Sequence, residues 1–385
     1  MPGATFGPSL RAGLVAILTA LFAAVLLAGC ASGPGPEVLD PVGAPAAGAR
    51  SVRLFVATTR TPEAPAGHRF TRGRSAEPAF AEYTVSVPPD HTAGQIEWPK
   101  GRPAAATTFA VLGHRALAPA TFHGDIAADA AGHGARKVAL FVHGYNTSFQ
   151  QALFRLAQMV ADSNIDGTPI LFAWPSEAAV AGYVADRDAA ALSRDALANL
   201  LVRLAADRRV GEITVMAHSM GGWLTVEVLR QLRLSGHGAV LSRLNVVLAA
   251  PDIDIDLFRA QMQVIGPFPR PVVVLVSPDD RALLVSRRIG GDRPRLGALE
   301  IGDPRVEAGA RAARIAIVDI SEVEGPGSLN HDRFVGLAAL YPRLAADERR
   351  GGGLFNKVGT FIFDTVDATL AAPAAAASPV GAAGE

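Results

Sequence analysis

Cysteine is almost absent from this sequence, which contains only Cys30. A single cysteine excludes an intramolecular disulfide bond and a zinc site built from cysteines. Net charge is also lacking, because 36 Lys and Arg residues balance 36 Asp and Glu residues. Without a basic excess there is no electrostatic reason to expect nucleic acid as a partner, and we expect none. No motif in the chain implies a metal ion or a cofactor.

The N-terminus reads as an export signal. An apolar run from Leu14 to Gly29 follows a charged start and ends in small residues, as secretory signals do. A transmembrane anchor needs about 20 apolar residues, so this run is marginal as an anchor. We therefore expect residues 1–29 to be a signal peptide, and the position directly after it decides which kind.

That position is a cysteine. Leu-Ala-Gly-Cys30 resembles the bacterial lipobox, in which the thiol takes a diacylglyceryl group and cleavage makes the cysteine the new N-terminus. The resemblance implies a lipid on Cys30 that anchors the protein to a membrane of the cell envelope. Ala31 differs from the Asp that marks inner-membrane retention, which favours the outer membrane, facing the periplasm. An ordinary signal peptide with a cysteine there by chance is the alternative.

Composition divides the rest of the chain. Residues 30–50 are rich in Gly, Pro and Ala, which predicts a flexible tether. Residues 366–385 are a low-complexity Ala/Pro tail, which predicts disorder. Between them, residues 51–365 form the predicted catalytic domain, which is long enough for one large core.

Within this domain, apolar β-branched runs alternate with amphipathic helical patterns, and the runs suggest strands buried on both faces. The sequence therefore predicts an α/β fold, with a mostly parallel, doubly wound sheet of about eight strands flanked by helices. The first two strands, which lack a helix between them, should pair antiparallel at one edge. We expect residues 88–136, where this alternation is interrupted, to be an ordered excursion from it within the same domain. The predicted helices are Phe149–Ser163, Asp188–Ala206 and Met220–Leu234, and the predicted strands are Val52–Thr58, Tyr83–Val87, Val138–His143, Ile170–Ala173, Ile213–Ala217, Asn245–Ala249, Val272–Val276 and Ile315–Ile320.

The motif richest in chemistry is Ala217-His-Ser219-Met-Gly221, which lies between a predicted strand and a predicted helix. A small residue on each side of the serine at this spacing is typical of a nucleophile elbow. The turn is so tight that strand and helix nearly touch, so bulky residues do not fit at Ala217 or Gly221. We expect Ser219 to be a nucleophile.

A serine hydroxyl needs a base, and enzymes with this elbow place their partners in the order Ser, acid, His. Only His237 and His331 follow Ser219, and His331 alone also follows the candidate acids of the late strands. The acid should lie just after a late strand, where the spacing from Ser277 favours Asp280 over its neighbour Asp279. Asp252, after the preceding strand, is a third candidate. The carboxylate not used as the acid is expected to cap the next helix.

Two backbone N–H groups should stabilise the oxyanion. One belongs to Met220. The other belongs to the loop after the third predicted strand, Val138–His143, at Tyr145 or nearby. Gly144 would let the backbone approach a substrate closely, and Asn146 could contact the substrate or serve a local role. His143, at the end of a strand and before Ser219, is expected to be structural.

Several of these segments together resemble a bacterial family of esterase- and lipase-like α/β hydrolases, long catalogued as a domain of unknown function. The resemblance covers roughly residues 52–340 and implies the α/β-hydrolase fold and a Ser219–Asp280–His331 triad, but no substrate. It is carried by Val-His-Gly-Tyr-Asn146, Phe-Ala-Trp-Pro-Ser176, Ala-His-Ser-Met-Gly-Gly222, Ala-Pro-Asp-Ile-Asp254, Ser-Pro-Asp-Asp-Arg-Ala-Leu283, Leu-Phe-Val-Ala-Thr-Thr-Arg60 and Val-Pro-Pro-Asp-His91.

The sequence thus favours a serine hydrolase acting on carboxylic esters, with a small-molecule or lipid ester as substrate. Two alternatives stay open. The same triad could serve an acyltransferase or an amidase acting on envelope material, because a fold does not determine a reaction. A non-enzymatic envelope lipoprotein could also keep this fold as a binding module.

Overall fold

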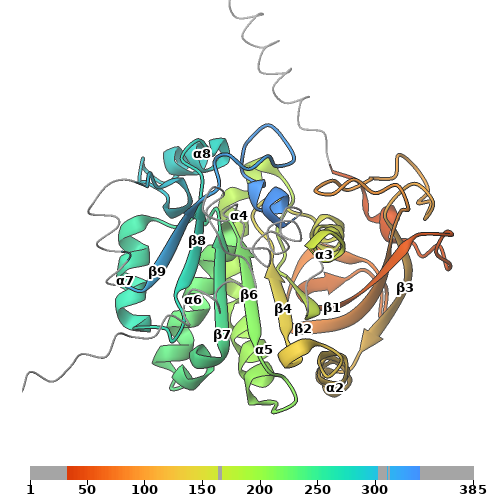
Figure 1. Ribbon diagram of the computed structural model, residues 1–385, viewed down its shortest axis with the longest axis horizontal. Coiled ribbons are helices and arrows are strands. Elements are labelled where there is room, and N and C mark those ends of the chain that lie inside the picture. Colours follow the sequence, from red (N-terminus) through yellow and green to blue (C-terminus); the bar gives the residue numbers. More distant parts are fainter. Residues whose placement is uncertain (1–32, 164–166, 302–309, 311–312, 339–385) are drawn as a thin grey trace, which may run out of the picture.

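A nine-stranded sheet runs through the computed structural model, which describes residues 33–163, 167–301, 310 and 313–338 (Figure 1). The strand order is β3-β2-β1-β5-β4-β6-β7-β8-β9. The pairs β1–β2 and β2–β3 are antiparallel, and every other pair is parallel. The strands are β1 Arg50–Pro62, β2 Phe70–Val87, β3 Ala110–Leu117, β4 Val138–Val142, β5 Thr168–Ala173, β6 Ile213–His218, β7 Leu244–Ala249, β8 Val272–Val276 and β9 Ile315–Asp319.

Helices cover both faces of the sheet (Figure 1). The helices are α2 Pro119–Ala130, α3 Phe149–Ser163, α4 Tyr183–Leu192, α5 Arg194–Ala206, α6 Met220–Leu234, α7 Ile255–Ile265 and α8 Arg281–Ile289. Short 3₁₀ turns are η1 Pro36–Leu39, η2 Gly134–Arg136, η3 Val180–Gly182, η4 Gly238–Arg243 and η5 Leu296–Ala298.

Two apolar cores, one on each face, hold these layers together. Leu140 of β4 packs on the face covered by α2 and α4–α7, whereas its neighbour Phe141 packs on the face covered by α3. All five residues of β4 are buried, and so are all five of β8. Burial on both faces is why the central strands read as continuous apolar runs rather than as alternating patterns.

The topology determines where a site can form. β4 lies between β5, which follows it in sequence, and β6, so the chain winds in opposite directions on its two sides. In open α/β sheets, such a switch point opens a crevice at the carboxyl ends of the strands. The loop after β4 and the turn after β6 meet there.

The predicted α/β class and mostly parallel sheet are confirmed, and the sheet has nine strands where about eight were expected. The additional strand, β3, lies in the predicted excursion together with α2, and β3 rather than β1 or β2 forms that edge of the sheet. Only Ala110 and Val111 of β3 are buried, so this edge strand has no apolar run to reveal it.

The predicted helix 188–206 is two helices, α4 and α5, which meet at Ser193. The Ser193 hydroxyl donates a hydrogen bond to the Ala189 carbonyl at 2.7 Å and lies 2.7 Å from the Thr59 hydroxyl. A serine that bonds to the preceding turn in this way competes with the helical pattern. Helical periodicity continues across the junction, which is why the sequence reads as one helix.

Part of the predicted tether is folded. Residues 36–39 form η1, whose Val38 and Leu39 are buried in the core beside α3. The Gly- and Pro-rich composition obscured these two apolar residues. The predicted signal peptide, Cys30 and the predicted tail 366–385 lie outside the described residues. None of the helices that the structure describes is both long and apolar enough to cross a membrane.

A half-buried histidine, His91, joins the segment after β2 to helix α3. His91 Nδ1 lies 2.7 Å from Glu97 Oε2, and its Nε2 lies 2.8 Å from Asp162 Oδ1. Burial acts to lower the pKa of His91, but the hydrogen bonds to Asp162 and Glu97 outweigh it and raise the pKa above its ordinary value. The charged imidazole therefore stabilises the folded state.

This histidine predicts a pH dependence of stability. Because its folded pKa is raised, its contribution is complete below the unfolded pKa, about 6.5, and is lost as the pH rises through the folded value. We expect His91→Gln to lower the free energy of unfolding by about 1–3 kcal/mol at pH 6 and by less at pH 9. Urea unfolding at both pH values measures this, with His237→Gln at an exposed loop as the control. An equal loss at both pH values would contradict it.

Candidate active site

The turn between β6 and α6 has the geometry of a nucleophile elbow. Ser219 connects the two with φ of 53° and ψ of −122°, a conformation that costs energy for any residue other than glycine. Its N–H donates to the Ala249 carbonyl of β7 at 2.9 Å, which ties the strained turn to the sheet. Ser219 is buried, with 4% of its surface exposed.

Position 221 accommodates only glycine, because α6 passes directly over β4. A Cβ atom at this position would lie 2.3 Å from the His143 carbonyl oxygen and 2.7 Å from that of Val142. Both are backbone atoms of the central strand and its loop, so neither can move without moving β4. The requirement for a small residue after the serine is thus a steric one.

We expect Gly221→Ala to lower the free energy of unfolding by about 1–3 kcal/mol, the usual cost of overpacking, or to prevent folding. Gly124→Ala is a matched control, because Gly124 lies in helix α2 and a Cβ there would meet nothing within 4 Å. That control should be neutral or stabilising by about 0.5–1 kcal/mol, because alanine favours helix. Urea unfolding compares the two, and equal stability of both variants would disprove the steric argument.

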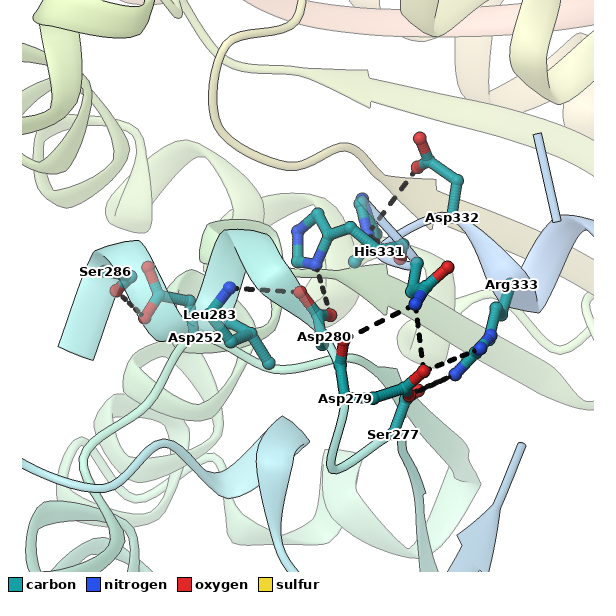
Figure 2. A network of polar contacts seen from close by, with 11 residues as sticks. Asp252, Ser277, Asp279, Asp280, Leu283, Ser286, His331, Asp332 and Arg333 are labelled. Atoms are coloured by element: carbon teal, nitrogen blue, oxygen red, sulfur yellow. Dashed lines mark hydrogen bonds and ion pairs between the residues drawn. The ribbon is translucent and has the colours of Figure 1, made fainter. Parts of the chain in front are cut away.

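The half-buried His331 and the buried Asp280 form a pair, shown in Figure 2. The Nδ1 atom of His331 lies 2.6 Å from Asp280 Oδ2, and the Asp280 side chain is fully buried. Burial acts to lower the pKa of His331, but the hydrogen bond and charge of Asp280, with the charges of Asp332 and Asp252, raise it above its ordinary value. The pair leaves the Nε2 atom of His331 available as a base.

Asp280 and Asp279 have different partners, although they are adjacent. Asp280 also caps α8, since its Oδ1 accepts the Leu283 N–H at 3.0 Å. The sequence analysis expected the partner of His331 and the helix cap to be different aspartates, whereas in the structure Asp280 both meets His331 and caps α8. Asp279 is half exposed and pairs with Arg333, at 2.9 Å from its Nη2 to Oδ2, and with Asn330 at 2.9 Å (Figure 2). It thus clamps the loop on both sides of His331.

His218, the residue before Ser219, connects the elbow to the His331 loop. Its ring centroid lies 4.5 Å from that of His331, and its Nε2 donates to the His331 carbonyl at 3.2 Å. Burial, with the nearby charge of His331, lowers the pKa of His218 to about 4, so it remains neutral. Within the described part of the chain the Ser219 hydroxyl makes no hydrogen bond, to His331 or otherwise. Catalytic hydrogen bonds are often loose without substrate.

The loop after β4 lies against the elbow. A Cβ atom at Gly144 would lie 2.9 Å from Ser219 Cβ and 2.9 Å from His218 Nδ1, so only glycine permits this approach. The Met220 N–H begins α6 and has no carbonyl acceptor within its own helix. The two candidate oxyanion segments, around Tyr145 and at Met220, therefore meet beside Ser219. The Tyr145 hydroxyl itself donates to the Val180 carbonyl of η3.

A buried carboxylate holds this loop. Asp186 of α4 accepts the Asn146 N–H at 3.1 Å and the Ser176 hydroxyl at 2.6 Å, and Ser176 Oγ accepts the Thr147 N–H at 3.1 Å. On the other side, buried Arg60 donates from Nη2 to the Thr147 carbonyl at 2.9 Å. The backbone of Asn146 is thus used locally rather than offered to a substrate.

Two further predicted residues have local partners. His143 is buried, stacks on Trp174 with centroids 4.8 Å apart, and has its pKa lowered to about 3 by burial, which suits the structural role expected of it. Asp252, the third candidate acid, accepts from the Tyr183 hydroxyl at 2.8 Å and pairs with Arg295 at 3.3 Å. Among the described residues, none of the hydrogen bonds of Asp252 goes to the His331 ring.

The sequence reasoning missed Asp186, Arg60, His218 and the clamp of Asp279 on Arg333. The Trp-Pro-Ser176 motif, directly after β5, leads towards Asp186, and the quoted motifs contain Arg60 and His218 without revealing their roles. The described residues contain no group of three or more His, Cys, Asp or Glu side chains that could hold a metal ion.

An elbow serine, a late Asp–His pair and a glycine loop on a mostly parallel sheet together define an α/β-hydrolase fold. Residues 119–348 match the family model described as "Alpha/beta hydrolase of unknown function (DUF900)", and the chain belongs to that family. The matched region includes Ser219, Asp280 and His331.

Comparison with solved structures finds a likeness to an esterase of Pyrobaculum calidifontis in its monoclinic form. It has 14% sequence identity and a TM-score of 0.29, and covers 70% of this chain and 81% of that one. This likeness is too distant to carry an inference about this chain. No curated protein matches the chain.

Proposed function

We propose that this chain is a serine hydrolase that cleaves carboxylic esters through an acyl-enzyme. The observation that carries the proposal is the Asp280–His331 pair beside the strained turn at Ser219, with its 2.6 Å hydrogen bond. A hydrogen-bonded acid is what fixes the tautomer of a histidine base and stabilises its charged form.

In the proposed mechanism, Ser219 Oγ attacks the ester carbonyl carbon while His331 Nε2 takes the hydroxyl proton. The Met220 N–H and a second N–H near Tyr145 stabilise the oxyanion. His331 then gives the proton to the leaving alcohol, and the acyl group remains on Ser219. Water, activated by His331, attacks the acyl-enzyme and releases the carboxylic acid and free Ser219. Asp280 stays ionised throughout and orients His331.

Labelling by a fluorophosphonate probe, followed by a p-nitrophenyl ester assay, tests the proposal. An activated serine should react with the probe, and peptide mapping should place the label on Ser219. The chain should also turn over p-nitrophenyl acetate or butyrate. An unlabelled chain would indicate a non-enzymatic binding module. A labelled chain that transfers its acyl group to an added alcohol without releasing free acid would indicate an acyltransferase.

We also propose that Cys30 carries a diacylglyceryl lipid and holds the domain at a membrane of the cell envelope, with the outer membrane, facing the periplasm, favoured. The lipobox-like Leu-Ala-Gly-Cys30 supports this. Metabolic labelling with radioactive palmitate should mark the chain, and Cys30→Ser should abolish the label. Equal labelling of Cys30→Ser would place the lipid elsewhere, and no label on the unsubstituted chain would contradict lipidation.

A further inference from the structure

Of the six large apolar side chains that are more than half exposed in the described chain, five lie on the segments around the candidate active site, and the sixth, Leu234, ends α6. Here the five are called the rim patch. Each has at least half of its surface exposed, which is costly for large apolar side chains in water. The patch consists of Val180 (60%), Val184 (69%), Val285 (54%), Ile289 (53%) and Leu329 (53%).

Hydrogen bonds connect the three segments that carry the rim patch to one another and to the catalytic pair. The Tyr183 hydroxyl of α4 bonds to Asp252 and lies 3.1 Å from the Ser286 hydroxyl of α8. The Leu329 carbonyl accepts the Arg281 N–H at the start of α8, 2.9 Å away. Asp280 caps α8, and Leu329 precedes His331 by two residues. In Figure 1, α4 and α8 lie at the same end of the molecule.

Basic side chains accompany this apolar surface. The segment 281–293 exposes Arg281, Arg287, Arg288 and Arg293, against one exposed acid, Asp292, which pairs with Arg287 at 2.8 Å. An apolar face flanked by arginines is the pattern by which helices bind to lipid interfaces. The excess positive charge favours an anionic surface over a neutral one.

The first described residues also lie near the carboxyl ends of the parallel strands, where the candidate active site is. A Cβ atom at Gly33 would touch the Gln151 side chain, and the Pro34 carbonyl accepts a hydrogen bond from Gln150. Both glutamines lie in the first turn of α3, shortly after the Gly144 loop that contacts Ser219. Cys30 is three residues before Gly33, and three residues span at most about 10 Å. A lipid on Cys30 would therefore hold this end of the sheet near the membrane.

From these observations we infer that the rim patch docks on an anionic lipid surface, so that the candidate active site faces the membrane. The patch and its arginines carry the inference without lipidation, while the position of Gly33 adds to it if Cys30 is lipidated. Resting on the proposed function, the consequence is a substrate class: esters with an acyl chain that enters from the lipid.

Fluorescence quenching tests the orientation without requiring catalysis. Full-length Val285→Cys and Val184→Cys are labelled with an environment-sensitive thiol dye and reconstituted into phosphatidylglycerol vesicles with brominated acyl chains. Leu234→Cys is the matched control, because Leu234 is also exposed (61%) but ends α6, which runs away from the elbow. The unsubstituted chain, whose single cysteine is Cys30, gives the labelling background.

We expect quenching at positions 285 and 184 to exceed that at 234 by about threefold or more, and to weaken in brominated phosphatidylcholine vesicles. Equal quenching at all three positions would overturn the inference. So would a blue shift at 285 that appears without vesicles and grows with protein concentration, which would assign the patch to a second copy of the chain. A chain that docks but cleaves no ester would overturn only the proposed function.

Discussion

Ser219→Ala should lower kcat for p-nitrophenyl butyrate by about 10⁶-fold, the loss typical when a nucleophile and its base act as one unit. Alanine keeps the small size that the elbow requires but removes the only atom that can form the acyl-enzyme. The residual rate would come from the oxyanion groups and substrate binding alone. The free energy of unfolding should change little or rise, because Ser219 holds a strained conformation and its hydroxyl makes no hydrogen bond within the described residues.

Steady-state kinetics and urea unfolding on the same preparation measure both effects. Ser193→Ala is a suitable control, because Ser193 is also buried but bonds to Thr59 and Ala189 between α4 and α5. It should lose stability and retain kcat, which is the opposite pattern. Full activity in Ser219→Ala would rule out this serine as the nucleophile.

Asp280→Asn should lower kcat by about 10⁴-fold with little loss of stability. An amide cannot stabilise the charged imidazole, and its NH₂ group favours the tautomer with the proton on the wrong nitrogen of His331. Asparagine caps helices as well as aspartate does, so the bond to the Leu283 N–H should survive. The kinetic effect can thus be separated from the structural one.

The pH profile adds a second measure of the same change. The pKa of His331 is raised in part by the hydrogen bond and charge of Asp280, so kcat/KM of the unsubstituted chain should fall below an apparent pKa that exceeds the ordinary histidine value. In Asp280→Asn this acid limb should move to lower pH. A merely structural role for Asp280 would leave it in place.

Asp279→Asn is the matched control for both measurements. It weakens the ion pair with Arg333 and the bond to Asn330 but leaves the Asp280–His331 contact, so we expect a loss in kcat of about tenfold or less. If instead Asp279→Asn were the inactive variant, Asp279 would be the acid and the role assigned to Asp280 would be wrong.

Local chemistry made several features predictable from the sequence. The apolar runs of β4, β6 and β8 reveal strands because these strands are buried on both faces, and small residues beside Ser219 reveal a turn in which helix and strand touch. Chain order alone singles out His331 among the histidines. The strand and elbow patterns depend on neighbours in sequence and the choice of His331 on chain order, so no distant contact had to be known.

The loop around Asn146 shows where such reasoning stops. Asp186 and Arg60 hold its backbone from α4 and β1, at sequence separations of 40 residues to Asn146 and 87 residues to Thr147. No local pattern marks a residue whose role is to satisfy a distant N–H or carbonyl. The same holds for edge strand β3, whose pairing with β2 depends on hydrogen bonds rather than on an apolar face of its own.

The sequence by itself determined the α/β class, the elbow at Ser219 and the choice of His331 by order. The spacing from Ser277 favoured Asp280 over Asp279, but only the tertiary structure decided which aspartate meets that histidine, because the two are adjacent and equally charged. In the folded chain the ring of His331, 51 residues later, meets Asp280, whereas its neighbours Asn330 and Arg333 bond to Asp279. Exposure of the rim patch was decided in the same way, since a valine or isoleucine in a sequence carries no sign of what will cover it.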